Sequence, residues 1–133
     1  MKRKYKNILL TGASGTLGQA VQKAGGFSSL LTPSRREMDI TELKSVENYF
    51  NERQIDGIIH CAALARISVC ERDPLKALDT NIVGTTNLVK TVLKKSPTVR
   101  FVHISTDGVY PGVKGEYKEK DATVPYNRYG WTK

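Results

Sequence analysis

Short apolar runs alternate with amphipathic segments along this sequence. Residues 7–11 (Asn-Ile-Leu-Leu-Thr) form an apolar run that ends at a glycine-rich turn, as a buried parallel strand does. After the turn, apolar residues recur at helical spacing from Leu17 to Ala24, until Gly25 and Gly26 end the pattern. The first predicted unit is therefore strand, turn and helix.

The same alternation continues to the last residues. Thr41 is the expected N-cap of a second helix, and Asp73 followed by Pro74 is typical of an N-cap with proline at the first helical position. The predicted elements after Gly26 are a weak strand at 29–32, a helix with Leu43, Val46 and Phe50 on its apolar face, a strand at 55–60, a loop up to Asp73, a helix from Pro74 to about Lys95, a strand at 100–105, a surface loop at 106–125 and the start of another helix.

This order of elements predicts a parallel sheet, because parallel strands need crossover connections that place helices on the faces of the sheet. We expect an α/β fold, a Rossmann-like doubly wound parallel sheet with helices on both faces. Since 133 residues is close to the commonest size of a single domain, residues 1–133 are expected to form one domain.

Composition narrows the function classes only partly. The formal net charge of +8 admits nucleic acid or a small phosphate-bearing molecule as a partner, because the basic residues are scattered apart from an N-terminal cluster. No apolar run is long enough for a membrane span or a signal-peptide core, so we expect a cytoplasmic protein. Cys61 and Cys70 lack a metal-ligand pattern, which predicts free thiols and no metal site.

The glycine-rich turn is the first candidate for chemistry. Glycines at its first, fourth and seventh positions permit a tight turn, close approach of the backbone to a pyrophosphate and close packing of helix on sheet, while the helix N-terminus offers free N–H groups to the anion. The alternative interpretation is a glycine-rich turn without a ligand. The candidate cofactor-binding residues here are Gly12, Ser14, Gly15, Thr16, Leu17 and Gly18.

The segment after the second predicted strand bears on the choice of cofactor. A carboxylate there would pair with a ribose hydroxyl of NAD, but Ser34 is followed by Arg35 and Arg36, and the first carboxylate is Glu37. An arginine can pair with a 2′-phosphate, which favours NADP(H) and leaves NAD(H) open. The alternative interpretation is a solvated pair of surface arginines.

Tyr129 and Lys133 are four residues apart, which on a helix places both on one face. A free tyrosine gives up its proton slowly near neutrality, whereas a nearby ammonium charge stabilises the phenolate. This pair taken alone is common and is usually an exposed helix pair.

Three motifs make the pattern specific. The chain carries STDGVY at 105–110, GEYKEKD at 115–121 and PYNRYGWTK at 125–133. Together with the turn at 12–18, they resemble extended short-chain dehydrogenase/reductases of the dTDP-4-dehydrorhamnose reductase type and their relatives, which include the noncatalytic regulatory subunit of methionine adenosyltransferase. The resemblance covers residues 8–133, the N-terminal portion of such proteins, and implies an NAD(P)-binding domain.

The resemblance implies a catalytic set. It assigns to Thr106 a hydroxyl that hydrogen-bonds the substrate carbonyl, to Tyr129 the proton donor, and to Lys133 a group that binds the nicotinamide ribose and tunes the tyrosine. Ser105 is the alternative hydroxyl, although strand alternation would point it to the other side. Capping of a strand end is the alternative interpretation for both hydroxyls.

It also implies further cofactor contacts. Asp39 and Ile40 match a step beside the adenine ring, with a helix-entry turn as the alternative, and Asn81 matches an asparagine that supports the site, with bonding to loop or helix backbone as the alternative. At Gly108 the reductases often carry an aromatic residue. The segment Cys61, Ala62 and Ala63 matches a position packed against the cofactor, where many relatives have Asn-Ala-Ala.

The function implied is NADP(H)-dependent reduction of a keto group on a nucleotide-diphosphate sugar, as in polysaccharide biosynthesis. The expected partner is the nucleotide-sugar substrate, with no nucleic acid or membrane, and a homodimer is left open. Two alternatives are an NAD-dependent nucleotide-sugar epimerase or dehydratase and a noncatalytic NADP-binding regulatory subunit. Relatives continue well past the lysine, so we expect a truncated fold that lacks the C-terminal strands and substrate lobe and is inactive alone.

Overall fold

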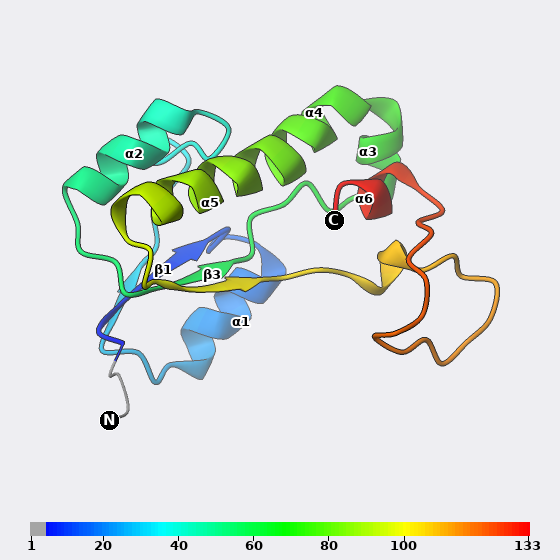
Figure 1. The fold of residues 1–133 in the computed structure, drawn as a ribbon, viewed down its shortest axis with the longest axis horizontal. Coiled ribbons are helices and arrows are strands. Elements are labelled where there is room, and N and C mark those ends of the chain that lie inside the picture. The colour runs from blue at the N-terminus through cyan, green and yellow to red at the C-terminus, as the bar shows by residue number, and fades with distance from the viewer. Residues whose placement is uncertain (1–4) are drawn as a thin grey trace.

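The computed structural model describes residues 5–133, and its centre is a four-stranded parallel sheet of order β2-β1-β3-β4 (Figure 1). The strands are β1 (Asn7–Thr11), β2 (Ser29–Leu31), β3 (Gly57–His60) and β4 (Arg100–His103). In the register of the sheet, Thr11 pairs with His60 and His60 pairs with His103, so the carboxyl ends of three strands lie side by side.

Helices cover both faces of this sheet. Helix α1 (Thr16–Ala24) lies on one face, while α2 (Leu43–Asn51) and α5 (Gly84–Lys95) lie on the other (Figure 1). The chain winds from β1 to β2 on one side and then crosses back to β3 and β4, so the strand order reverses between β1 and β3. The expected doubly wound, Rossmann-like parallel sheet is confirmed.

The core lies between the sheet and the two helices α2 and α5 that cover one of its faces. The apolar spacing seen in the sequence accounts for it, because Val46 and Phe50 of α2 and Leu88 and Val92 of α5 point inward. The buried cluster consists of Leu9, Met38, Ile40, Val46, Tyr49, Phe50, Ile55, Ile58, Leu88 and Val92.

Two local expectations are wrong. The segment expected as a loop before Asp73 contains a short helix, α3 (Ile67–Arg72), which buries Cys70. This helix has only six residues, several of them polar, so its sequence shows no helical pattern. Thr41 does not cap α2: Glu42 is the N-cap residue, and the Thr41 hydroxyl instead donates to the Asp39 carboxylate at 2.7 Å.

The predicted long helix is present, with an irregular turn in its middle. It begins as α4 (Pro74–Leu78), where the Asp73 carboxylate accepts the Lys76 N–H at 3.1 Å, as an N-cap should. It then passes through a π-helical turn, η1 (Asp79–Val83), and continues as α5. A π turn inserts one extra residue and reorients side chains locally, and such turns are frequent at functional sites.

The C-terminal part of the described chain leaves the sheet after β4. A 3-10 turn, η2 (Asp107–Val109), is followed by the expected irregular loop and by the short helix α6 (Arg128–Trp131). No helix within residues 5–133 is both long and apolar enough to cross a membrane.

Candidate functional site

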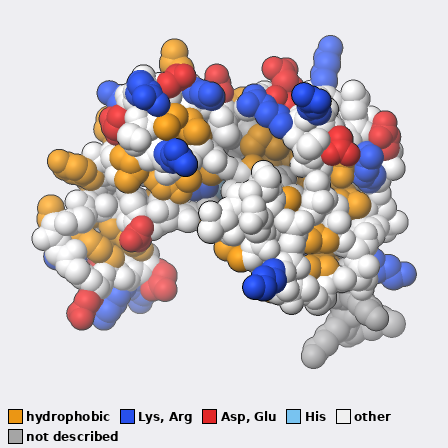
Figure 2. All heavy atoms as spheres, turned by 180° about the vertical axis from the view of Figure 1, so that it is seen from behind, with side chains coloured by type: hydrophobic (Ala, Val, Ile, Leu, Met, Phe, Trp, Pro, Cys, Tyr) orange, Lys and Arg blue, Asp and Glu red, His pale blue; other side chains and the backbone are white. Residues whose placement is uncertain are grey.

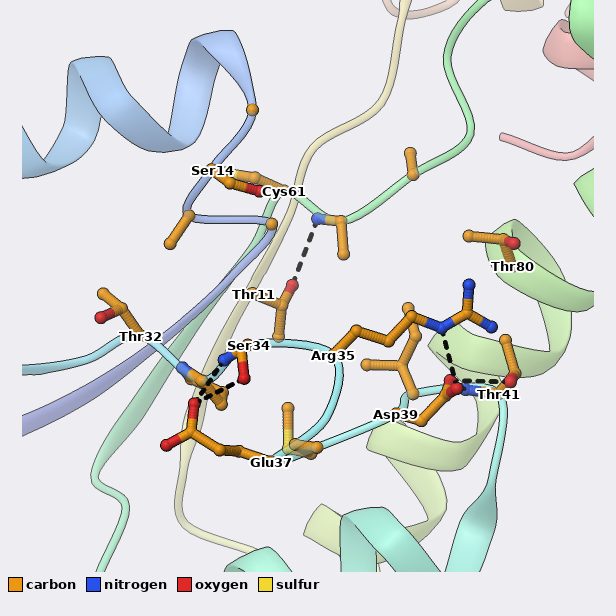
Figure 3. Close-up of a pocket in the computed structure, with 18 of the residues that line it drawn as sticks. Thr11, Ser14, Thr32, Ser34, Arg35, Glu37, Asp39, Thr41, Cys61 and Thr80 are labelled. Carbon is orange, nitrogen blue, oxygen red and sulfur yellow. Dashed lines mark hydrogen bonds and ion pairs between the residues drawn. The ribbon is translucent and has the colours of Figure 1, made fainter.

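A cavity of about 710 Å³ opens at the carboxyl ends of β1 and β3, where the strand order reverses. Ligands of open α/β sheets bind at such a switch point. Figure 3 shows the cavity between the glycine-rich turn, the loop at 32–41 and the π turn. Of the predicted cofactor-binding residues, those that line it are Gly12, Ser14, Gly15, Arg35, Ser34, Asp39, Ile40, Cys61, Ala62 and Ala63.

The glycines of the turn are required by backbone contacts. Gly12 has a φ of +69°, and a Cβ there would lie 2.6 Å from the Ala62 nitrogen. A Cβ on Gly18 would lie 2.2 Å from the Gly12 carbonyl oxygen, so this glycine allows α1 to pack on the turn. Thr16, Leu17 and Gly18 belong to α1 and do not line the cavity.

The loop after β2 presents charged groups that are already paired. The Ser34 N–H and hydroxyl both donate to one Glu37 carboxylate oxygen at 2.8 Å, and these bonds lower the pKa of Glu37. Arg35 forms an ion pair with Asp39 at 2.9 Å (Figure 3). Burial alone would raise the pKa of Asp39, but hydrogen bonds from Arg35 and Thr41 lower it.

The predicted adenine neighbour, Ile40, is held from the long helix. The Asn87 amide donates to the Ile40 carbonyl at 2.9 Å in a buried position. A Cβ on Gly84 would lie 2.8 Å from the Ile40 side chain, so the helix approaches closely because residue 84 is glycine. The loop wall of the cavity is therefore positioned by α5.

Asn81 of the π turn connects two segments far apart in sequence. Its amide oxygen accepts the Leu64 N–H at 2.8 Å, and its amide nitrogen donates to the Leu64 carbonyl at 3.1 Å and to the Thr132 hydroxyl at 2.7 Å. The neighbouring Thr80 lines the cavity. Asn81 itself is buried and does not line it, so the structure shows the backbone-bonding role that the sequence left as an alternative.

None of the predicted catalytic residues, Thr106, Tyr129 and Lys133, is among the residues that line the cavity. Helix α6 is capped by Asn127, whose side chain accepts the Gly130 N–H at 2.8 Å. A Cβ on Gly130 would lie 2.1 Å from the Gly108 carbonyl oxygen, so the backbone of α6 rests on the turn that follows Thr106. The Tyr129 side chain is half-buried on this helix.

Lys133 and Thr106 occupy different environments. Burial lowers the pKa of Lys133, and the negative charge that Cys61 would carry as a thiolate opposes that effect. Helix α6 ends at Trp131, two residues before Lys133. The Thr106 hydroxyl accepts the Gly108 N–H at 3.1 Å and donates to Asp107, so it caps the turn η2 and not the end of β4. Ser105 is exposed.

Several lining residues were not predicted. Most of them reach the cavity through tertiary contacts, which leave no pattern in the sequence. Thr11 is the exception, because its place directly before the glycine-rich turn could have been read from the sequence. The unpredicted lining residues are Thr11, Ala13, Gln19, Gln22, Thr32, Pro33, Glu37, Met38, Thr41 and Thr80.

The family described as "RmlD substrate binding domain" matches residues 6–133. The chain belongs to this family. Among relatives of this RmlD-type chain, methionine adenosyltransferase 2 subunit beta of Pongo abelii is 31% identical over 96% of the chain and 40% of that protein. The dTDP-4-dehydrorhamnose reductase of Mycolicibacterium smegmatis is 33% identical over 96% of the chain and 39% of that protein.

Solved structures agree with this assignment. The dTDP-4-dehydrorhamnose reductase of Bacillus anthracis, solved in complex with NADP, has a TM-score of 0.89 and 27% identity, covering 99% of this chain and 48% of that one. The RmlD-type chain thus spans less than half the length of these relatives. The resemblance to the N-terminal portion of this reductase family is confirmed.

Proposed function

We propose that this chain is the cofactor-binding part of an NADP(H)-dependent oxidoreductase that reduces a keto group on a nucleotide-diphosphate sugar. The observation that carries the proposal is the cavity at the β1/β3 switch point, closed on one side by a turn where Gly12 has no room for a side chain. We further propose a cytoplasmic location, with which the two free cysteines agree.

The residues present fit a dinucleotide. Gly12 permits a backbone approach that a Cβ would block, and Gly15 places the N-terminus of α1, whose first turn carries no acidic residue, at the cavity. Free N–H groups at that terminus favour a pyrophosphate. The Arg35 guanidinium is exposed on the cavity wall and can turn from Asp39 to a 2′-phosphate. The B. anthracis relative holds NADP.

The chain's own residues supply position and proton transfer. When bound, the cofactor would supply the hydride that reduces the carbonyl carbon. The Thr106 hydroxyl would polarise the carbonyl oxygen, and the Tyr129 phenol would give its proton to the developing alkoxide. The Lys133 ammonium would hold the ribose and favour the phenolate that Tyr129 leaves behind.

A second candidate is a noncatalytic regulatory subunit. It is favoured by the 31% identity to methionine adenosyltransferase 2 subunit beta. The presence of Thr106, Tyr129 and Lys133 favours the reductase.

The test is a titration of the protein with NADPH and NADH, followed by an assay of NADPH oxidation with a nucleotide-linked keto sugar. We expect NADPH to bind at least tenfold more tightly than NADH, and Arg35→Ala to remove that preference while Arg36→Ala, outside the cavity lining, keeps it. Tyr129→Phe should spare binding and abolish any reduction. Binding of neither nucleotide would refute the proposal, and reduction that survives Tyr129→Phe would refute the role of the tyrosine.

A further inference from the structure

His60 lies at the end of β3 with only 1% of its surface exposed, and the function proposed above gives it no part. Its Nδ1 is 2.6 Å from the Thr11 hydroxyl oxygen, and its Nε2 is 2.9 Å from the Thr85 hydroxyl oxygen. The rings of Phe101 and His103 pack against the imidazole. Both ring nitrogens are therefore engaged, each by a hydroxyl from a different element.

The positions of the protons follow from the partners. The single hydroxyl proton of Thr85 is donated to the Asn81 carbonyl at 2.6 Å, so towards His60 the Thr85 oxygen can only accept. Nε2 must then carry a hydrogen. Burial, with the charges of His103 and Lys133, lowers the pKa of His60 to about 3, so the ring is neutral and its Nδ1 accepts the Thr11 hydroxyl proton.

One end of this arrangement is in the cavity wall. The Thr11 oxygen, having donated its proton to His60, accepts the Ala62 N–H at 3.2 Å. Thr11 and Ala62 both line the cavity. Each hydrogen is used once, and the bonds run in one direction from the Ala62 N–H to the Asn81 carbonyl. We call Ala62, Thr11, His60, Thr85 and Asn81 the His60 network.

The other end reaches the helix of the proposed proton donor. Asn81, whose backbone receives the last bond of the His60 network, donates from its side chain to the Thr132 hydroxyl at 2.7 Å. That hydroxyl in turn donates to the Tyr129 carbonyl at 2.9 Å. Within residues 5–133, no buried side-chain nitrogen or oxygen lacks a hydrogen-bond partner. The bonds from Ala62 to Tyr129 therefore include no unsatisfied buried side-chain atom.

We propose that His60 is a positioning residue: as a neutral imidazole with its hydrogen on Nε2, it fixes the Ala62 end of the cavity wall and the π turn on which Tyr129 is held. The role rests on the proposed function, because it serves the placement of cofactor and proton donor. A phenylalanine or leucine of similar bulk would fill the space and leave the Thr11 and Thr85 hydroxyls without their partner.

Two substitutions separate the two ends. The amide of asparagine reaches about as far as Nδ1 and the amide of glutamine about as far as Nε2, so His60→Asn retains the bond to Thr11 and His60→Gln retains the bond to Thr85. His60→Asn should therefore shift the backbone amide NMR resonances of Gly130 and Thr132, and His60→Gln that of Ala62, whose N–H donates to Thr11. Each should weaken NADPH binding about five-fold, the equivalent of one hydrogen bond.

Thr85→Val has a matched control in the same helix. Thr85 and Thr91 both donate to the carbonyl four residues earlier, but only Thr85 receives His60. The nitrogen spectrum of the wild-type imidazole at pH 7 should show the neutral form with hydrogen on Nε2. Thr85→Val should abolish that pattern, and Thr91→Val should preserve it.

The outcomes separate this proposal from the proposed function. Hydrogen on Nδ1 in the wild type, or Thr85→Val spectra that match those of Thr91→Val, would overturn the role of His60 whether or not nucleotide binds. A wild-type protein that shows the Nε2 form and the expected resonance shifts but binds no NADPH would overturn the proposed function instead, and with it the positioning role, while leaving the His60 network as a structural feature.

Discussion

At the scale of single residues, two glycines at the two ends of the first turn-and-helix segment are subject to different constraints. Gly12 and Gly25 have nearly the same φ, +69° and +66°, which side chains rarely adopt. A Cβ on Gly25 would meet nothing within 4 Å, whereas one on Gly12 would meet the backbone of Cys61 and Ala62 below 3 Å. Backbone strain is common to both positions, and the close contact with the segment that follows β3 is particular to Gly12.

This pair gives a prediction about stability and binding. Gly25→Ala should cost only the strain, about 1–3 kcal/mol of unfolding free energy. Gly12→Ala should cost more, because the turn must move away from the backbone of Cys61 and Ala62, and should raise the Kd of NADPH more than tenfold. Urea unfolding and fluorescence titration measure the two effects. Equal losses in both variants would show that the contact with Ala62 is unimportant.

At the scale of elements, the long helix from Pro74 to Lys95 does more than cover the sheet. Its π turn brings Thr80 to the cavity and Asn81 to the loop before α3, and its next turns hold Ile40 through Gly84 and Asn87. One side of the cavity is therefore a loop held by one hydrogen bond, between residues 47 apart in sequence, and by close packing against Gly84 of the long helix.

Asn87→Ala tests this dependence. It leaves the buried Ile40 carbonyl without its partner, which should lower the unfolding free energy by about 1–3 kcal/mol and weaken NADPH binding about five-fold. Asn48→Ala, on the exposed side of α2, should change neither quantity by a measurable amount. If NADPH binding is unchanged by Asn87→Ala, loop 32–41 holds its position without α5.

At the scale of the whole molecule, buried histidine makes stability depend on pH. His60 has a pKa of about 3 in the folded chain, mainly because burial disfavours its charged form, and a pKa of about 6.5 when unfolded. Below pH 6.5 the unfolded state therefore binds a proton at His60 that the folded state does not bind. The contribution of neutral His60 to the free energy of unfolding is fully present above that pH and is lost as the pH falls towards 3. Burial also lowers the pKa of His103, which adds in the same direction.

Between pH 7 and pH 5, His60 alone should remove about 2 kcal/mol of unfolding free energy. The carboxyl groups of Asp39 and Asp56 have lowered pKa values and act only at lower pH. Urea unfolding at the two pH values measures the loss. His60→Gln should reduce this dependence to the part contributed by His103, and an unchanged slope would assign the dependence to another group.

The sequence predicted the fold well because apolar spacing reports directly on buried faces: Leu9, Val46, Phe50 and Leu88 are all core residues. It missed α3, whose six residues are too few to show a helical period. The glycine turn and the Ser34–Asp39 segment were recognised from local chemistry. Thr80 and the His60 network were not, because a π turn and long-range hydrogen bonds leave no periodic trace.

Gly130 carries a consequence for engineering. Its lack of a side chain lets the helix of Tyr129 lie directly on the carbonyl of Gly108, two residues after Thr106. The distance between residues 106 and 129 is thus set by a contact between two backbone segments and not by the side chains of these residues. Libraries that vary residues 106 and 129 should alter reactivity on a frame of constant spacing, whereas any side chain introduced at 130 would alter the frame itself.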